Sequence, residues 1–316
     1  MDEFLRMSQL FTDGHACIVG VGADLPNTVN DAVGLADLLK NPERCAYPPE
    51  QVQLLTEEQA AKTNVLDALD KLAATTTATS TVIVYFSGHG YKLSHPMMGD
   101  RYFLIPYGYD LNKLANTTIS GDEFVAKLRS IPAKKFLLLL DCCHAGGLGD
   151  LSEVGLAAEK APLPPEARAL FEKGKGRIVI ASSKADEKSW AGKPYSAFTL
   201  ALVEALAGQG ASVKDGYVRV ADVAMYAREV VPRRTRNRQH PILNFEGADN
   251  FHLAYYAGGE PEPKGLPYEG EPEIEMESAD RDRPQTQINQ NVNQRGKYNI
   301  NVGNASGFRI GDDTKP

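Results

Sequence analysis

The sequence lacks the features that mark membrane, secreted and disulfide-rich proteins. No apolar run is long enough to span a bilayer or to form the core of a signal peptide, so we expect neither. Four cysteines are too few for a disulfide framework in a chain of 316 residues, and two of them are adjacent. This cysteine usage favours a reduced, cytoplasmic setting, which would also keep a thiol reactive.

An excess of positive charge is missing as well. The formal net charge is −7 and the pI about 5.5, whereas a nucleic-acid partner requires a basic face. There is no EF-hand loop, and the run Cys142-Cys143-His144 is too compact for one tetrahedral zinc site. With 42% hydrophobic and 24% charged residues, the composition is ordinary for a globular protein and predicts one large domain with appendages.

Apolar runs alternate with helix-like segments over the first 257 residues. We predict strands at 15–21, 52–55, 81–86, 136–140 and 177–181, and helices at 30–40, 60–74, 119–128 and 196–207. Uninterrupted apolar runs such as FLLLL are typical of strands that are covered on both faces. The alternation therefore predicts an α/β fold around a mainly parallel sheet.

Three segments depart from this alternation. Residues 148–176 contain Pro and Gly and predict an exposed loop, while 258–284 are acidic and rich in Pro and Gly, which predicts a disordered linker. Residues 285–316 are rich in Asn and Gly, with apolar residues at alternate positions. We therefore expect a main domain at 1–257, a linker at 258–284 and a β-prone interaction motif at 285–316.

Two of the predicted strands end in reactive residues. One runs as VIVYF into Ser87-Gly88-His89-Gly90, and the other as LLLL into Asp141-Cys142-Cys143-His144. Ligands of open α/β sheets bind beyond the carboxyl ends of the strands, so both motifs lie where a site is expected. A cysteine needs its thiolate to attack a carbonyl, and a nearby histidine can generate that thiolate. Either residue alone would more often be structural, but the pair predicts a nucleophilic site.

The motifs YFSGHG and DCCHAGG resemble the two catalytic signatures of caspase-like peptidases (family C14), especially metacaspases and their bacterial relatives. Cys143 follows His89 by roughly 50 positions, a spacing known for caspases. The resemblance covers about 15–257 and implies a three-layer α/β/α sandwich and a cysteine endopeptidase. It makes Cys143 the nucleophile and His89 its base, with the backbone N–H groups of Gly90 and Cys143 as the oxyanion hole.

The residues after Cys143 include an alternative base and a departure from the family pattern. His144 is the alternative base, but we expect its side chain to point away from that of its neighbour Cys143. Many relatives carry Ser-Gly after the Cys-His pair, whereas this chain has Ala145-Gly146. Alanine keeps the small size, so we expect activity to survive this difference.

The resemblance to metacaspases also implies cleavage after Arg or Lys, because their S1 pocket is acidic. It places Asp141 and Asp31 in that pocket, where two carboxylates suit a guanidinium. We also expect Ser182 or its neighbour Ser183 to line the pocket. The other interpretation of Asp31 is an ordinary first-turn residue of a helix. No cofactor is expected, and calcium is expected at most as an activator. An Arg/Lys-specific enzyme could also cut its own loop at Lys160, Arg168, Lys173 or Lys175.

The end of the chain contains an approximate repeat. The residues Ile300 to Asn304 (INVGN) recur eight positions later as Phe308 to Asp312 (FRIGD). They resemble the short amyloid-type signalling motifs of microbial cell-death and antiviral defence effectors, which implies a sensor protein with a matching motif as partner. A disordered tail or a hairpin that docks on another partner are the alternatives.

Two competing functions are open at this point. A catalytically silent caspase-like scaffold would bind peptides or partners without cleaving them, although the presence of His89 and Cys143 argues against it. A different cysteine hydrolase, of the separase or legumain type, is the other, although Asp141 and the compact size favour the metacaspase side.

Overall fold

The computed structural model describes residues 10–95, 99–110, 113–142, 157–160, 177–184, 187–245, 249–276, 299–300 and 310–311. The chain divides into one compact unit that extends to Met276 and a second that comprises Glu277–Pro316. Cys143 lies outside the described residues, as do His144, Ala145 and most of the predicted loop at 148–176.

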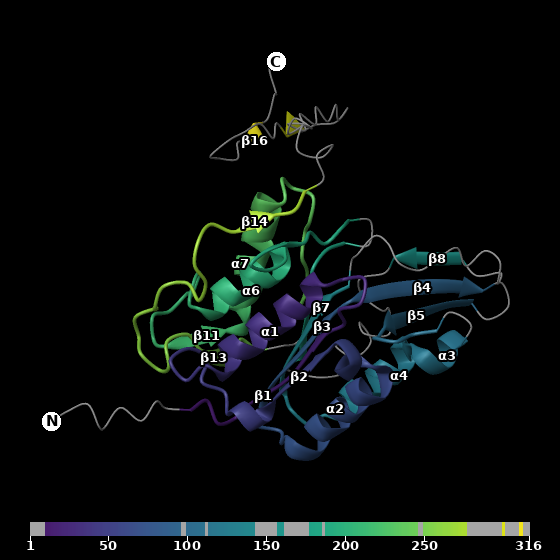
Figure 1. Ribbon diagram of the computed structural model, residues 1–316. Helices are drawn as coiled ribbons and strands as arrows, with labels where there is room; N and C mark the ends of the chain where they lie inside the picture. The colour runs from purple at the N-terminus through teal and green to yellow at the C-terminus, as the bar shows by residue number, and fades with distance from the viewer. Residues whose placement is uncertain are drawn as a thin grey trace. The chain divides into compact units, whose positions relative to one another are not determined.

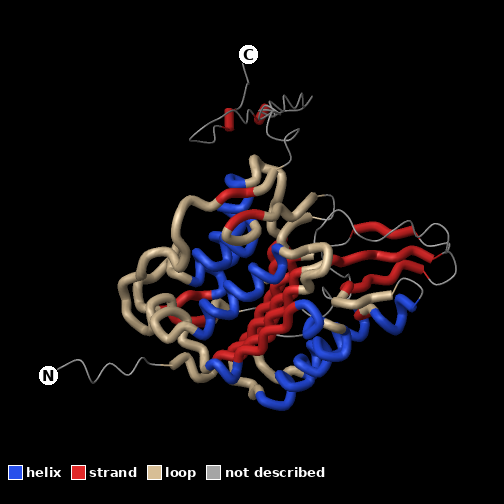
Figure 2. The backbone as a smooth tube through the Cα atoms, viewed as in Figure 1, coloured by secondary structure: helices blue, strands red, loops and turns tan. Residues whose placement is uncertain are grey.

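A mixed sheet forms the centre of the first unit (Figures 1 and 2). Among the described residues it has six strands in the order β12-β9-β7-β3-β1-β2. The antiparallel strand β12 lies at one edge, and all other neighbours are parallel. The strands are β1 (Gly14–Gly20), β2 (Val52–Thr56), β3 (Thr81–Ser87), β7 (Lys135–Asp141), β9 (Arg177–Ala181) and β12 (Ile242–Asn244).

Helices cover both faces of this sheet and make three layers (Figure 1). One face packs against α1 (Asn27–Lys40), α6 (Ala197–Leu206) and α7 (Val220–Arg234). The other face packs against α2 (Lys62–Thr75) and α4 (Gly121–Ser130). The short helix α3 (Leu114–Thr117) and the 3₁₀ turns η1 (Pro49–Gln51) and η2 (Glu57–Ala60) lie in connections. This is the predicted α/β/α sandwich.

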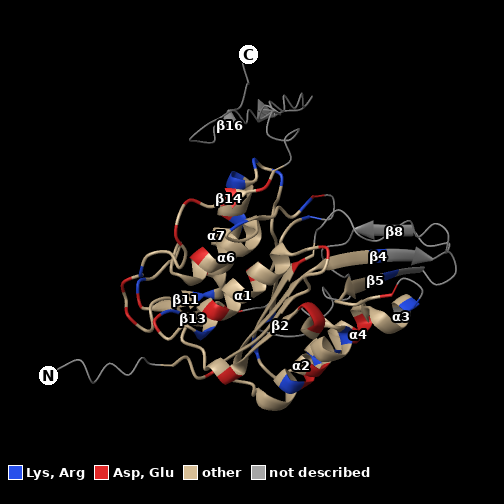
Figure 3. Ribbon diagram, in the orientation of Figure 1, with Lys and Arg blue, Asp and Glu red and all other residues tan. Residues whose placement is uncertain are grey.

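The central strands are buried from end to end because both of their faces are covered. Side chains alternate between the faces, so Leu137 and Leu139 contact the α1 and α6 side while Leu138 and Leu140 contact the α2 and α4 side. In Figure 3 the charged residues lie mainly on helices and loops, and the central strands carry none along most of their length.

The strands and helices predicted from the apolar pattern are present within a few residues of their predicted ends. Ser120 caps the helix predicted at 119–128, since it precedes α4 and its side chain accepts a hydrogen bond from the Glu123 N–H at 3.2 Å.

A second sheet, which the apolar pattern did not predict, continues from the histidine motif. Its order is β6-β5-β4-β8, all antiparallel. These strands are β4 (His89–His95), β5 (Gly99–Ile105), β6 (Ile119–Ser120) and β8 (Ala157–Lys160). Gly88 joins β3 to β4, and a Cβ there would lie 2.7 Å from a methyl group of Val21. Glycine therefore allows the histidine motif to pack closely against the loop that follows β1.

The prediction of a disordered linker at 258–284 is wrong for residues 258–276, because these residues belong to the first compact unit. Within this segment, β14 (Glu273–Ile274) pairs with β10 (Gly192–Lys193), and Met276 is buried. The Tyr268 hydroxyl donates to Glu204 of α6. Acidic and Pro/Gly-rich composition predicted exposure correctly for most of these positions, but a few well-spaced apolar side chains are enough to anchor them. The remaining antiparallel pair of this unit is β11 (Tyr217–Arg219) with β13 (His252–Tyr255).

Four residues of the second unit are described. Asn299–Ile300 (β15) and Ile310–Gly311 (β16) form an antiparallel pair, with Ile300 opposite Ile310. The two copies of the predicted repeat therefore each contribute one strand to the same pair.

Candidate active site

Polar side chains gather where three neighbouring strands end. Ser87 ends β3, Asp141 ends β7 directly opposite it, and Ser182 follows β9 with its N–H bonded to the Leu140 carbonyl at 2.8 Å. The alternation that buries Leu139 against α1 and α6 places all three on that same face. All three are fully buried. At its carboxyl edge, the apolar core of the α1 and α6 face thus gives way to a packed cluster of buried polar side chains, which we call the acidic chamber.

Two carboxylates face this chamber from different elements. Asp141 accepts hydrogen bonds from Ser189 Oγ at 2.6 Å and Ser196 Oγ at 3.2 Å. Asp31, which projects from α1, accepts one from the Ser196 N–H at 2.8 Å. Ser196 also caps α6, since its hydroxyl accepts from the Thr199 N–H at 3.2 Å. One serine therefore ties both acids to the beginning of α6.

Burial and mutual repulsion dominate the electrostatics of this pair. Burial, with the Asp141 charge second, raises the pKa of Asp31 to about 8, against hydrogen bonds from Ser196 and Thr199 that lower it. Among the described residues, neither carboxylate has a Lys, Arg or His in hydrogen-bonding contact. Two buried acids without a cation are unfavourable, so the chamber suits a positively charged group from outside.

A buried glutamine links several residues on one side of the acidic chamber by hydrogen bonds. Gln239 donates to the Ser182 carbonyl at 3.0 Å and to Ser189 Oγ at 3.1 Å, and its side-chain oxygen accepts from the Trp190 N–H at 3.0 Å. The Ser182 hydroxyl is fully buried and has no hydrogen-bond partner among the described residues. It therefore has donor and acceptor capacity that a bound ligand could use.

His89 lies at the same edge of the sheet. It begins β4, and its side chain is only 3% exposed. Its Nε2 lies 2.8 Å from Oδ2 of Asp24, which belongs to the loop between β1 and α1 and is 48% exposed. The ring also packs beside Tyr91, with centroids 5.7 Å apart. Gly90, the predicted oxyanion residue, is buried opposite Leu104 in the antiparallel pair of β4 and β5.

The described cysteines are core residues. Cys17, Cys45 and Cys142 are all buried. The Cys142 thiol lies 3.9 Å from the Phe86 carbonyl on the α2 and α4 face, opposite to the acidic chamber. Burial raises the pKa of Cys17 to about 12 and that of Cys45 further. None of the three has the surroundings of a nucleophile, and the assignment of that role to Cys143 stays a prediction.

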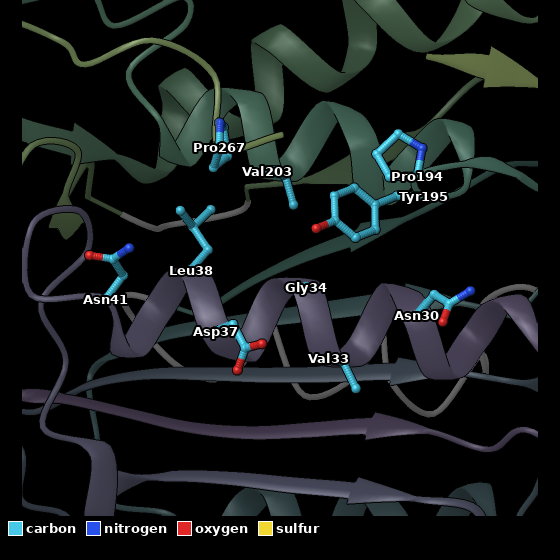
Figure 4. A pocket seen from close by; sticks show the side chains of 10 residues that line it. All are labelled: Asn30, Val33, Gly34, Asp37, Leu38, Asn41, Pro194, Tyr195, Val203 and Pro267. Carbon is cyan, nitrogen blue, oxygen red and sulfur yellow. The ribbon is translucent and has the colours of Figure 1, made fainter. Parts of the chain in front are cut away.

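A surface pocket of about 440 Å³ lies elsewhere, over the outer side of α1 (Figure 4). Its lining includes Val33 and Gly34 of α1, with Tyr195, Val203 and Pro267 opposite. The Tyr195 ring lies so close to Gly34 that a Cβ there would be 2.2 Å from it. None of the predicted site residues lines this pocket. It is therefore separate from the acidic chamber.

In the described part of the chain, no group of three or more His, Cys, Asp or Glu side chains is arranged to hold a metal ion. Among the described helices, none combines the length and apolarity needed to cross a bilayer.

A histidine and a buried acidic cluster at one sheet edge are consistent with the protein family that the sequence matches. The caspase domain (peptidase family C14) matches residues 13–252, which is more than half of the chain. The chain belongs to the caspase-domain family. This confirms the family that the two motifs predicted, which is a family of cysteine peptidases.

Individual relatives of this caspase-family chain are distant. Metacaspase-1B from Aspergillus terreus is 26% identical over 146 residues, which are 43% of this chain and 38% of the metacaspase. A Geobacter sulfurreducens protein of solved structure has 17% identity and a TM-score of 0.49, and the match covers 73% of this chain and 92% of that one. Caspase-1 from Spodoptera frugiperda has 14% identity and a TM-score of 0.44, with 80% and 94% covered.

The structure brings Asp31, Asp141 and Ser182 together, with His89 at the same sheet edge. In place of the first-turn interpretation, the Asp31 side chain is buried and accepts a hydrogen bond from Ser196, the N-cap residue of α6. Asp24, Ser189, Ser196 and Gln239 were not predicted from the sequence. Asp24 was detectable in principle, because it is a polar residue just beyond a buried strand, at the edge where His89 and Asp141 also lie.

Proposed function

We propose that this protein is a cysteine endopeptidase that cleaves peptide bonds after Arg or Lys. The observation that carries the specificity is the pair of buried carboxylates, Asp31 and Asp141, which lack a basic partner among the described residues. A guanidinium carries five N–H donors and binds carboxylates in a bidentate manner. Its entry would neutralise the repulsion between the two acids and favour the ionised form of Asp31.

The chemistry assigned to the other residues follows the Cys-His scheme. The Cys143 thiolate attacks the scissile carbonyl, and the N–H groups of Gly90 and Cys143 stabilise the resulting oxyanion. His89 gives a proton to the leaving amine, which departs and leaves a thioacyl enzyme. Water then attacks the thioacyl carbon as His89 accepts its proton, and the carboxylic product leaves as the thiol is restored. The surroundings of Cys142 support this choice between the adjacent cysteines.

The first test is cleavage of fluorogenic peptides that carry Arg, Lys, Asp or Asn before the scissile bond. We expect turnover of the Arg and Lys peptides by the wild type and none by Cys143→Ala, whose thermal melting should match that of the wild type. The assay is run with and without calcium, because we propose calcium only as an activator. Turnover of the Asp or Asn peptide alone would overturn the specificity, and unchanged turnover by Cys143→Ala would overturn the nucleophile.

Self-cleavage is measured in the same preparations. We propose that the loop at 148–176 is cut after one of its basic residues, of which Lys160 is described and lies opposite Tyr91 in the pair of β8 and β4. Mass spectrometry of the wild type should show fragments that are missing from Cys143→Ala. An intact wild-type chain that nevertheless turns over Arg peptides would remove self-processing from the proposal.

We further propose that the segment after Met276 recruits the enzyme to a sensor protein in a microbial cell-death or defence response in the cytoplasm. The pairing of the two repeat copies through β15 and β16 supports an interaction motif built from short strands. Clustering by such a motif would raise the local concentration of enzyme. A peptide of residues 284–316 is expected to form fibres that bind an amyloid dye. A peptide that stays monomeric under these conditions would refute templated assembly.

A further inference from the structure

Asp24 is the one carboxylate that the described residues place against His89. The contact joins residues that are 65 positions apart in the chain, at 2.8 Å between Asp24 Oδ2 and His89 Nε2. The two partners differ in exposure, because the Asp24 side chain is 48% exposed whereas the His89 side chain is only 3% exposed. Water can solvate the carboxylate while the imidazole stays enclosed, so the pair avoids the penalty of burying an isolated charge.

The loop that carries Asp24 has a fixed and unusual backbone. Gly22 and Ala23 both adopt left-handed conformations, with φ of 71° and 55°. The Leu25 N–H closes the turn on the Gly22 carbonyl at 2.9 Å. The buried Thr28 hydroxyl then locks it, accepting from the Gly22 N–H and donating to the Leu25 carbonyl, both at 2.8 Å.

A left-handed conformation is unfavourable for alanine and persists only where its surroundings impose it. Here the consequence of the turn is that the next residue, Asp24, meets the histidine.

We propose that Asp24 is a positioning residue that orients His89 and stabilises its protonated form during peptide cleavage; this inference rests on the proposed peptidase function. With Nε2 held by the carboxylate, Nδ1 is the ring nitrogen that exchanges a proton with the reacting groups. Among the described residues, the titratable groups beside this pair are Tyr91, two positions along β4 from His89, and Tyr109 beyond β5. Burial, and then the charge of Asp24, raises the pKa of Tyr109, so that phenol stays neutral and does not compete with the carboxylate.

The test compares Asp24→Asn and Asp24→Ala with Asp24→Glu. The matched control is Asp70→Asn, which removes a carboxylate of similar exposure, 51%, from an ion pair with Lys127 on the surface of α2 and α4. We expect Asp24→Asn and Asp24→Ala to lower kcat roughly ten- to hundredfold on an Arg peptide, with KM changed by less than about twofold, because proton transfer and not binding is impaired. Asp24→Glu should recover part of the lost kcat, and Asp70→Asn should behave as the wild type.

A second measurement uses the full-length protein without a peptide. Alkylation of Cys143 by iodoacetamide, followed by mass spectrometry, should be slower in Asp24→Asn than in the wild type, because the thiolate is less well supported by its histidine. Wild-type kcat and alkylation rates in both Asp24→Asn and Asp24→Ala would overturn the inference while leaving the peptidase intact. A wild type that neither turns over Arg peptides nor alkylates selectively at Cys143 would instead overturn the proposed function. Equal losses of kcat in Asp24→Glu and Asp24→Ala, with lowered melting temperatures, would show a structural role only.

Discussion

Two carboxylate sites share the carboxyl edge of the central sheet and differ in their access to water. Asp24 is about half exposed and has one histidine partner. Asp31 and Asp141 are buried, lie near one another and are held by serine hydroxyls and a backbone N–H. An acid that water still solvates can orient a histidine at little energetic cost, whereas burial and the nearby Asp141 disfavour the charged form of Asp31 until a cation arrives. We therefore propose that the first site serves proton transfer and the second substrate selection.

The largest expected effect is the loss of Arg and Lys cleavage in Asp141→Ala and in its closer isostere Asp141→Asn. Removing one partner of a buried charge pair costs about 3–5 kcal/mol of interaction energy, so kcat/KM for these peptides should fall roughly 100- to 1,000-fold or more. The loss should appear as much in KM as in kcat, in contrast to the Asp24 variants. Fluorogenic peptides measure it, with Asp70→Asn as control and thermal melting to check the fold. Retained cleavage in both Asp141 variants would remove Asp141 from the pocket.

The two sites also differ in how far the sequence predicts them. Long apolar runs specify the central strands, because only strands covered on both faces are so uniformly apolar. Asp141 was accessible because it directly continues such a run, and Asp31 because a family motif marks it. For Asp24, only its position just beyond a buried strand is visible in the sequence. Its contact with His89 depends on a left-handed alanine and on Thr28, neither of which leaves a signal in composition or periodicity.

The residues that bind the acidic chamber from distant parts of the chain could not be predicted, for a related reason. Ser196 meets Asp141, and Gln239 meets Ser182, only after α6 and α7 have packed on the sheet. The segment 258–276 misled prediction because its anchors, Tyr268, Ile274 and Met276, are few among many exposed polar residues. Local patterns encode the sheet, whereas the site depends on contacts between distant elements.

A smaller effect, about tenfold per pH unit at most, is expected from the proton on Asp31. Its pKa is raised to about 8 in the free protein, so below that pH the carboxyl is protonated and must release its proton when a guanidinium binds. Affinity for an Arg peptide should therefore rise with pH up to about 8 and then level off. Calorimetry on Cys143→Ala, in buffers of different ionisation enthalpy, measures both the affinity and the proton released.

The matched variant for this titration is Asp31→Asn, which lacks the titrating group. It should bind the Arg peptide more weakly at pH 8, show no proton release and lose most of the pH dependence. Proton release that persists unchanged in Asp31→Asn would mean that another group titrates on binding. The Asp24–His89 pair would then be the first place to look, and the division of roles between the two sites would fail.

The smallest effect should come from the segment 258–276, which pairs with the residues between Ser189 and Ser196. Its strand β14 pairs with Gly192 and Lys193, and the Glu275 N–H bonds the Ala191 carbonyl, between the two serines that hold Asp141. A chain that ends at Met276 should match the full-length enzyme on Arg peptides. A chain that ends at Ala257 should show KM raised by roughly several-fold, because Ser189 and Ser196 are less firmly placed, while the rate of Cys143 alkylation stays the same. If the shorter chain shows both a raised KM and a slower alkylation of Cys143, the segment supports the whole fold. A local effect on the acidic chamber would leave the alkylation rate unchanged.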